Sequence, residues 1–175
     1  PLKSYMFDTL TGKNNSLLNG NPHTFFIAKR NGRSVGRVLT GINCLLNKKK
    51  NKNEGYISLF ESIQDLKVSK ALLDNASQWL LDRNMETITG PVSPTNGDEY
   101  RGLLIKGFDK PPVILNSYNP PYYIDMFEEF GFSKQLDFHA FYLEPQKSIM
   151  KRFEKVVNYG MKKYDFSIQP LKLKD

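Results

Sequence analysis

A polar segment at residues 93–102 carries the side chains that are best suited to binding a charged molecule. It combines turn-forming residues with two carboxylates, Asp98 and Glu99, and one guanidinium, Arg101. Binding groups are commonly found on loops that are anchored to a rigid sheet. Asp98 and Glu99 would suit a cationic amine, with Arg101 orienting them. A solvated turn with a local ion pair explains the same residues equally well.

Metal and disulfide chemistry find little support in the sequence. His23, His139 and the single cysteine, Cys44, lie too far apart in the chain to form a metal-ligand motif, so we expect no metal site. One cysteine excludes an internal disulfide and predicts a reducing, cytoplasmic setting. No apolar run approaches the roughly 20 residues that span a bilayer, and we expect no membrane partner.

The net charge of +7 is unevenly distributed along the chain. Residues 1–60 carry a balance of +8, residues 61–144 of −6 and residues 145–175 of +5. A nucleic-acid-binding domain usually spreads basic residues over its folded core. Because the middle of this chain is acidic, a nucleic-acid partner is not expected, and a small-molecule ligand is favoured. The sequence leaves the oligomeric state open.

The first half of the chain reads as an irregular lead-in followed by antiparallel strands. Residues 1–22 are rich in turn formers. Strands are predicted at 24–28 and 34–42, joined by a two-residue turn at Asn31-Gly32. Residues 48–53 are predicted to form a polar loop. The apolar stretch 55–61 then predicts a central strand.

A helix and a parallel strand should follow the central strand. Asp65 is a suitable N-cap, and the helix is predicted over about 66–83. Its buried face comprises apolar residues spaced three and four apart, namely Val68, Leu72, Ala76, Trp79 and Leu80. Residues 85–90 read as a strand, so this strand–helix–strand unit predicts a parallel pair with a right-handed crossover.

The remaining sequence predicts a long loop, two helices and further strands. Residues 91–118 form the loop, with a short strand possible at 113–116. Asn119 is a suitable cap for a helix that ends at Gly131. Residues 134–143 look like a final strand, and a basic amphipathic helix follows Pro145.

Taken together, residues 23–144 resemble a GNAT (N-acetyltransferase-like) domain. The closer likeness is to a group of uncharacterised bacterial GNAT-like proteins. It runs through Gly90-Pro91-Val92, Leu103-Leu104, Gly107-Phe108-Asp109, Pro112, Asn119-Pro120-Pro121-Tyr122-Tyr123 and Gly131-Phe132. The resemblance implies an α/β (α+β) fold with a mixed, largely antiparallel sheet flanked by helices, incomplete at its N-terminus.

The same resemblance implies transfer of an acyl group from acyl-CoA to an amine. Such a reaction needs a base for the amine and often a tyrosine that protonates the departing thiolate. Glu61, at the end of the central strand, is the candidate base, although a solvated carboxylate explains it too. The family's tyrosine position holds Phe127 here. Tyr122 or Tyr123 would have to substitute as the acid, unless both serve only in packing.

The cofactor implied is acetyl-CoA or another acyl-CoA, bound through its pyrophosphate at a helix N-terminus. Gln64 matches the first position of the family's phosphate motif, but no glycine follows. Asp65 would repel phosphate, which Lys67 and Lys70 would partly offset. Asn119 is a further cofactor-binding candidate. An ordinary capped helix is the competing interpretation.

The alternative to an enzyme is a catalytically silent GNAT-fold half that binds a ligand or acts as a scaffold in a larger two-unit protein. Whether the chain is an enzyme is left open. We expect a lead-in at 1–22, a GNAT-like domain at 23–144, a basic amphipathic helix at 145–165 and the start of a second GNAT-like unit at 166–175. The last segment is similar to the opening strand of GNAT domains. Missing flanking sequence of the same protein is therefore an expected partner.

Overall fold

The computed structural model describes residues 3–13, 15–95, 99–142, 144, 147–167 and 169–170. It divides into two compact units, Pro1–Ser133 and Lys134–Asp175, and each is described by itself. The elements, in chain order, are α1 (Lys3–Leu10), β1 (His23–Arg30), β2 (Arg33–Ile42), α2 (Cys44–Lys50), β3 (Glu54–Ser62), α3 (Leu66–Leu81), β4 (Thr87–Val92), α4 (Tyr123–Phe130) and α5 (Lys147–Tyr164).

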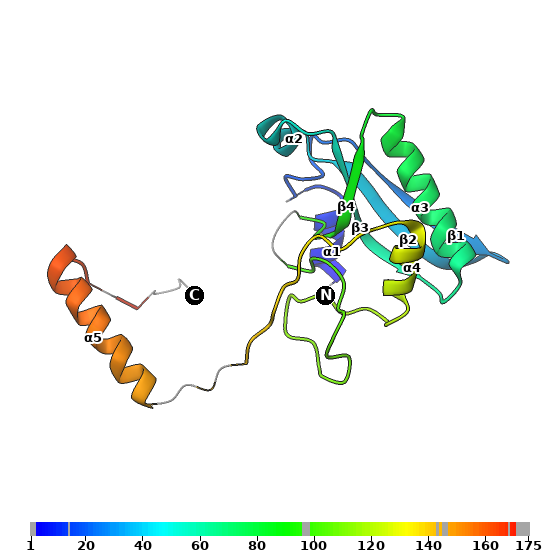
Figure 1. Cartoon of the computed structure of the whole chain (residues 1–175). Coiled ribbons are helices and arrows are strands. Elements are labelled where there is room, and N and C mark those ends of the chain that lie inside the picture. Colours follow the sequence, from blue (N-terminus) through cyan, green and yellow to red (C-terminus); the bar gives the residue numbers. More distant parts are fainter. Residues whose placement is uncertain are drawn as a thin grey trace. The chain divides into compact units, whose positions relative to one another are not determined.

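The first unit is built on a four-stranded sheet in the order β1-β2-β3-β4 (Figure 1). β1 pairs with β2 and β2 with β3 in antiparallel fashion, while β3 and β4 are parallel. The predicted mixed, largely antiparallel sheet flanked by helices is therefore confirmed. So is the parallel pair joined by a helix, because α3 lies between β3 and β4 in the chain.

The hairpin turn between β1 and β2 follows directly from its sequence. Asn31 and Gly32 have φ angles of 51° and 76°. A two-residue turn with positive φ at both positions matches the right-handed twist of the strands that it joins, and Asn-Gly is the residue pair that adopts it most readily. The turn fixes the register of β1 on β2. β1 extends beyond both of its predicted ends, and β2 begins one residue before its predicted start.

A bulge near the end of β3 interrupts its pairing with β2. Leu39 pairs with Ser58 and Arg37 with Glu61, so β3 uses one residue more than β2 over this interval. Leu59 lies inside the bulge with a φ of 50°, a left-handed conformation that costs energy for a leucine. Bulges bend a strand and re-aim the side chains beyond them. Here the affected residues are Phe60, Glu61 and Ser62.

The main core lies between one face of the sheet and the helices α3 and α4. Its buried side chains include Val38 and Ile57 from the sheet, and Val68, Leu72, Leu73 and Ala76 from α3. The predicted Asp65 cap is confirmed, because its carboxylate accepts a hydrogen bond from the Lys67 amide at 2.9 Å. α3 ends at Leu81, two residues before the predicted end.

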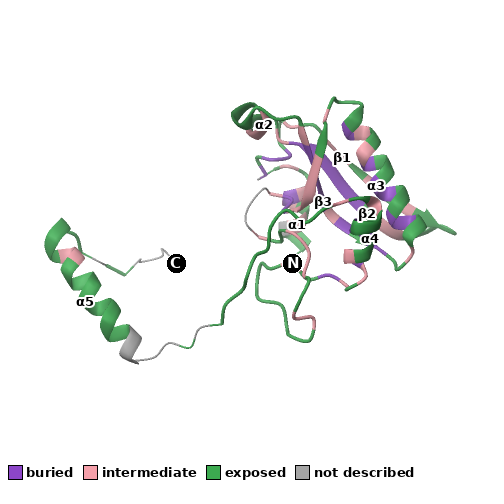
Figure 2. Ribbon diagram, in the orientation of Figure 1, coloured by how far each residue is buried: buried purple, intermediate pink, exposed green. Residues whose placement is uncertain are grey.

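A smaller cluster covers the opposite face of the sheet, where Leu17 and Leu18 pack against Leu39 and Tyr56. Much of β2 and β3 is buried (Figure 2). Because successive side chains of a strand point to opposite faces, these two strands contribute to both clusters. The lead-in is also more ordered than predicted. Residues 3–10 form helix α1, and Asn15 binds the carbonyls of Thr9 and Pro94 at 3.0 and 2.8 Å.

Three other local predictions were wrong. Of the segment 48–53 predicted as a loop, residues 48–50 belong to helix α2, which Asn43 caps by accepting from the Leu46 amide. Residues 113–116 form a turn instead of a strand. Asn119 does not cap α4: the N-cap is Tyr122, and Asn119 instead binds the backbone of Leu104. Two consecutive prolines follow Asn119, and the regular helix begins only after them.

In the second unit, the predicted strand at 134–143 is absent over residues 134–142, which form neither helix nor strand. Leu136, Phe138, Phe141 and Tyr142 are exposed there. A strand needs a partner for its backbone groups, and alternation of apolar residues does not supply one. The basic amphipathic helix is present as α5. Among the described residues, no helix is long and apolar enough to cross a bilayer.

Candidate functional site

A cavity of about 580 Å³ opens at the carboxyl end of β3. All three predicted catalytic residues, Glu61, Tyr122 and Tyr123, line it. The rest of the lining comes from β1, from β2 and from the end of β3 with its following residue: Ile27, Ser34, Val35, Gly36, Arg37, Ser62 and Ile63. The cavity therefore joins the sheet to the start of α4.

The local strand geometry makes room for this cavity. The last residue pair between β3 and β4 is Ser58 with Val92. β3 continues four residues further, to Ser62, and β4 does not accompany it. Side chains of α4 occupy part of the space beyond. The Phe60 ring meets the rings of Tyr123 and Phe127 edge-on at 5.1 and 5.0 Å between centroids.

The hydroxyl groups of the two tyrosines at the start of α4 both form hydrogen bonds with the backbone of Ser62. Tyr122 donates its hydroxyl hydrogen to the carbonyl oxygen of Ser62 at 3.0 Å. The hydroxyl oxygen of Tyr123 accepts a hydrogen bond from the amide of Ser62 at 2.9 Å. The hydroxyl hydrogen of Tyr123 has no acceptor in the part of the chain that the structure describes. Of the two phenols, Tyr123 is therefore the one whose proton is available.

Burial raises the pKa of the Tyr123 hydroxyl, and the nearby Tyr122 and Glu61 raise it further, against the opposing effects of the Ser62 amide and Arg37. A raised pKa keeps the phenol protonated at neutral pH. Tyr123 can thus act as a hydrogen-bond donor toward a group in the cavity. It cannot act there as a phenolate base.

Glu61 lies at the rim of the cavity and is paired across the sheet. One guanidinium nitrogen of Arg37 contacts Oε1 of Glu61 at 2.8 Å, and the side chain of Glu61 is 63% exposed. The bulge at Leu59 places the two residues opposite each other. Because Arg37 contacts one carboxylate oxygen, the second oxygen can meet an amine or ammonium group.

The start of α3 differs from a phosphate-binding helix terminus. The carboxylate of Asp65 accepts the Lys67 amide and also pairs with Arg30 at 2.6 Å. The bond from Arg30, with that from the Lys67 amide, lowers the pKa of Asp65, so this carboxylate is charged at neutral pH. A negative group therefore already occupies the helix end where an anion would bind.

The other predicted cofactor-binding residues do not gather at this helix end. Gln64 is exposed just before it. Lys70 pairs with Asp74, one turn further along α3, at 2.7 Å. Asn119 is buried and holds the loop to the start of α4, accepting from the Leu104 amide at 2.6 Å.

The predicted substrate-binding loop folds on itself. The carboxylate of Glu99 accepts hydrogen bonds from the hydroxyls of Ser93, at 2.9 Å, and Thr95. The Thr95 bond is the largest cause of a lowered pKa at Glu99, to which the charge of Arg101 also contributes. Neither Glu99 nor Arg101 lines the cavity. Asp98 lies outside the described residues.

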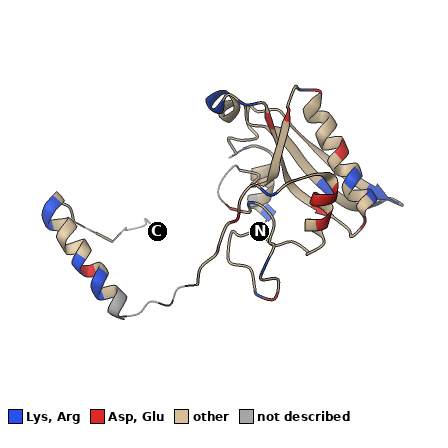
Figure 3. Ribbon diagram, viewed as in Figure 1, with Lys and Arg blue, Asp and Glu red and all other residues tan. Residues whose placement is uncertain are grey.

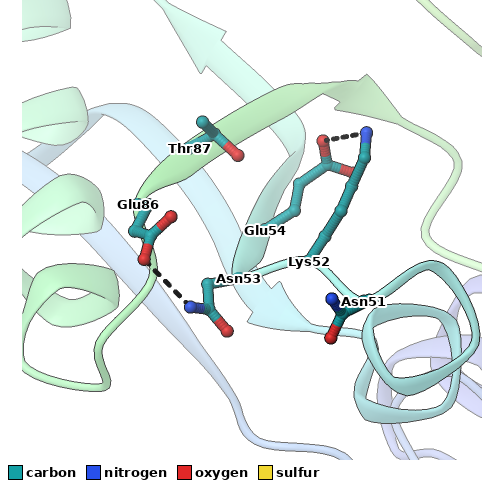
Figure 4. A pocket seen from close by; sticks show the side chains of 6 residues that line it. All are labelled: Asn51, Lys52, Asn53, Glu54, Glu86 and Thr87. Atoms are coloured by element: carbon teal, nitrogen blue, oxygen red, sulfur yellow. Dashed lines mark hydrogen bonds and ion pairs between the residues drawn. The ribbon is translucent and has the colours of Figure 1, made fainter.

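A second cavity, of about 330 Å³, lies at the opposite end of β3 and β4 (Figure 4). Glu86 accepts a hydrogen bond from Asn53 at 3.0 Å there, and Lys52 lies 3.9 Å from Glu54. In parallel strand pairs, ligands bind at the carboxyl ends of the strands. This cavity lies at the amino ends, and the bond between Asn53 and Glu86 links the residues that precede β3 and β4.

Sequence reasoning did not identify Arg37 or Ser62 as site residues. Arg37 reaches Glu61 only because a bulge shifts the pairing of β2 and β3. No residue pattern near Leu59 predicts that bulge. Ser62 takes part through its backbone amide and carbonyl, so its residue type gives no signal in the sequence. The adjacent polar residues Glu61 and Ser62, directly after a buried strand, were the available signal.

No model of a protein family matches the chain. In sequence it is similar to protein YghO of Escherichia coli (strain K12), at 33% identity over 68% of this chain and 30% of the relative. It is also similar to a bacterial ceramide synthase of Caulobacter vibrioides (strain NA1000 / CB15N), at 29% identity over 98% of this chain and 47% of the relative. The chain thus spans less than half the length of either protein.

Two solved structures of an aminoglycoside acetyltransferase from an uncultured soil metagenomic sample are similar at 14% identity. The complex with trehalose gives a TM-score of 0.46, covering 83% of this chain and 76% of that one. The complex with sisomicin gives 0.44, covering 82% and 86%. The chain is thus similar in sequence to two bacterial proteins, YghO and a ceramide synthase, and its fold is an α/β fold with a mixed, largely antiparallel sheet.

Proposed function

We propose that this chain carries the acyl-transfer site of an N-acyltransferase, which moves an acyl group from a thioester to an amine. The observation that supports the proposal is the convergence of Glu61, Tyr122 and Tyr123 on one cavity at the end of β3. These residues are up to 62 positions apart in the chain. They supply the two proton-handling groups, a carboxylate and a protonated phenol, that such a reaction uses.

The proposed chemistry assigns one proton to each group. The amine nitrogen attacks the carbonyl carbon of the thioester, so that a C–N bond forms and the C–S bond breaks. Glu61 takes the proton that the nitrogen loses, and Tyr123 gives its proton to the departing sulfur. Solvent then returns a proton to Tyr123 and removes one from Glu61. Tyr122, whose hydroxyl hydrogen is bound to Ser62, positions the strand end.

Acetyl-CoA or another acyl-CoA is the proposed donor, but the start of α3 does not fit its pyrophosphate. Asp65 places a negative charge there and takes up the Lys67 amide. We therefore infer that the acyl group and the thioester contribute more to donor binding than the phosphates do. Gln64 and Lys67, which are exposed beside this helix end, would supply a weaker phosphate contact.

The proposed acceptor is a long-chain amine. Ceramide is an amide of a long-chain amino alcohol. The similarity to the ceramide synthase of Caulobacter vibrioides covers 98% of this chain and 47% of the synthase. The cavity lining combines the charged Glu61 with apolar residues, including Ile27, Val35 and Ile63. A carboxylate beside apolar side chains suits a molecule with an ammonium head and a hydrocarbon body.

The test is amide formation, followed by mass spectrometry, when acyl-CoA and a long-chain amine are mixed with the protein. Tyr123→Phe and Glu61→Gln should each lower the rate about 10²-fold or more, since each removes a proton-transfer group. Tyr56→Phe, a buried tyrosine on the other face of the sheet, and Glu128→Gln, an exposed carboxylate on α4, are matched controls that should keep the rate. Equal rates in all four variants would rule out the proposed roles.

A catalytically silent ligand-binding or scaffolding half is the second candidate function. Two observations favour it: Asp65 blocks the helix end where phosphate would bind, and Phe60, Tyr123 and Phe127 fill much of the space beside the end of β3. A silent domain would form no amide with any thioester. It would still bind a long-chain amine, and the same mass-spectrometric assay combined with amine titration separates the two functions.

A further inference from the structure

Helix α5 exposes an apolar face between Met150 and Tyr164. Phe153 is 60% exposed and Val156 is 64% exposed, and Met150, Val157 and Tyr164 are also accessible. These residues recur at spacings of three and four. At about 100° per residue they fall within one arc of the helix, together with Gly160 and Met161.

The opposite face of α5 is strongly basic. The helix sequence contains six Lys or Arg residues and a single acid, Glu154. Lys151, Lys155 and Lys162 lie at the centre of the polar arc, and Arg152 and Lys163 lie nearer the apolar face. Figure 3 shows Lys and Arg at several levels of the coloured part of the helix. Apolar and basic residues are thus sorted onto two sides.

The residues after the helix extend its apolar face. The ring of Phe166 lies beside Gly160, where a Cβ atom would be 3.7 Å from two ring carbons. Phe166 is itself 46% exposed. Lys163 lies 5.2 Å from the centre of the Tyr164 ring, which brings a cation next to an exposed aromatic side chain at the helix end.

We propose that α5 binds, parallel to the surface, to a bilayer that contains anionic lipids. A helix that separates apolar from Lys- and Arg-rich faces, with low overall hydrophobicity, settles at the boundary between headgroups and acyl chains. Phe153, Val156 and Val157 would enter that boundary. Long basic side chains such as Arg152 and Lys163 would extend along the apolar surface and reach the phosphates.

Charge favours a lipid surface over a second copy of this chain. Two copies of α5 packed through their apolar faces would bring two strongly basic helices together, and like charges repel. Anionic headgroups instead compensate the six cations. Among the described residues, no helix is long and apolar enough to cross a bilayer, so the proposed contact is peripheral. It revises the expectation from the sequence that the chain has no membrane partner. This inference rests on α5 alone and is independent of the proposed acyl transfer.

The test is co-sedimentation of the full chain with vesicles. We expect binding to phosphatidylcholine vesicles containing about one quarter phosphatidylglycerol, and at least tenfold weaker binding to phosphatidylcholine alone. Raising the salt concentration from about 0.05 to 0.5 M should weaken the binding, because it shortens the range of the electrostatic attraction. Lys155→Gln combined with Lys162→Gln should weaken it roughly 25-fold, about fivefold for each cation.

Matched variants distinguish binding through the apolar face from nonspecific adsorption to vesicles. Phe153→Ser combined with Val157→Ser should abolish vesicle binding. Tyr159→Ser removes an exposed aromatic ring from the basic side of the same helix and should leave binding within about twofold. Circular dichroism checks that the helix forms in each variant with vesicles present.

Two results would overturn the proposal. The first is no sedimentation with anionic vesicles at low salt. The second is vesicle binding that Tyr159→Ser weakens as much as the Phe153→Ser and Val157→Ser pair does. If vesicles do not bind and the chain self-associates through Phe153 and Val157 in sedimentation velocity, the apolar face is a protein interface instead.

Discussion

Ser62 ends β3 with both of its backbone polar groups bound by tyrosine hydroxyls. Tyr122 takes the carbonyl and Tyr123 the amide, so the start of α4 is fixed to the strand end. The same contact leaves the Tyr123 proton directed away from Ser62. Tyr123 therefore serves both the packing of α4 and the proposed proton transfer.

Replacing Tyr123 by Phe should destabilise the fold by about 1–3 kcal/mol, because the buried Ser62 amide would lose its acceptor. Tyr122→Phe should cost about 1 kcal/mol or less, since its hydroxyl is only partly buried. Urea denaturation of the two variants measures the difference. Equal stability losses would show that the two contacts are equivalent.

Tyr56 presents the opposite case, a buried hydroxyl without a hydrogen-bond partner among the described residues. Tyr56→Phe should therefore raise the free energy of unfolding by about 1 kcal/mol.

Burial raises the Tyr56 pKa above its usual value of 10. Above that pH the unfolded chain loses the phenolic proton while the folded chain keeps it, so stability falls as pH rises. The wild type should lose stability faster than the variant above about pH 10, as urea titration at several pH values would show. Parallel loss in both would contradict this assignment.

At the scale of elements, the cap of α3 decides how phosphate can bind. Asp65→Asn keeps a good cap and removes the negative charge, so helix stability should change little. Arg30 would also lose its carboxylate partner and become available. We expect affinity for free CoA to rise several-fold, measured by calorimetric titration. Unchanged or weaker CoA binding would mean that phosphate does not approach this end of α3.

The contact between β2 and β3 depends on Gly36. A Cβ atom there would lie 2.7 Å from Cδ1 of Leu72 and 2.8 Å from the carbonyl oxygen of Glu61. Gly36→Ala should therefore destabilise the fold by about 1–3 kcal/mol and displace Glu61. Thermal unfolding measures the first effect, and the loss of amide formation the second. A variant with native stability and rate would show that the strand end adapts freely.

Much of this arrangement could be predicted because local chemistry determines it. Asn31-Gly32 specifies its hairpin, and Asp65 specifies the start of α3. The chain order of strand, helix and strand specifies the parallel pair. Residues 134–142 show the limit of such reasoning, since an alternating pattern predicts a strand but cannot supply the neighbour that a strand needs.

The candidate site was predictable only in part. Glu61 was predicted from its position at the end of the central strand, and Tyr122 and Tyr123 from the acid that the resemblance implies. The fold places all three around one cavity. Arg37 depends on the bulge at Leu59, which no local pattern announces. Glu99 was predicted to face a substrate, but nearby hydroxyls bind its carboxylate, because short-range partners in a turn compete with any ligand.

At the scale of the whole molecule, the chain consists of an α/β unit that carries the cavity and a second unit that carries α5. Both relatives by sequence are more than twice as long as this chain. Ligand binding can therefore be tested on this chain alone, whereas the proposed activity of the whole protein needs a separate test.

The central claim is that the cavity at the end of β3 receives an acyl thioester, recognised mainly through its acyl part. Calorimetric titration of long-chain acyl-CoA into the chain, with free CoA as the control, tests it most directly. We predict micromolar binding of acyl-CoA, at least tenfold tighter than free CoA. Equal binding of the two, or no heat from acyl-CoA at millimolar concentration, would contradict the account.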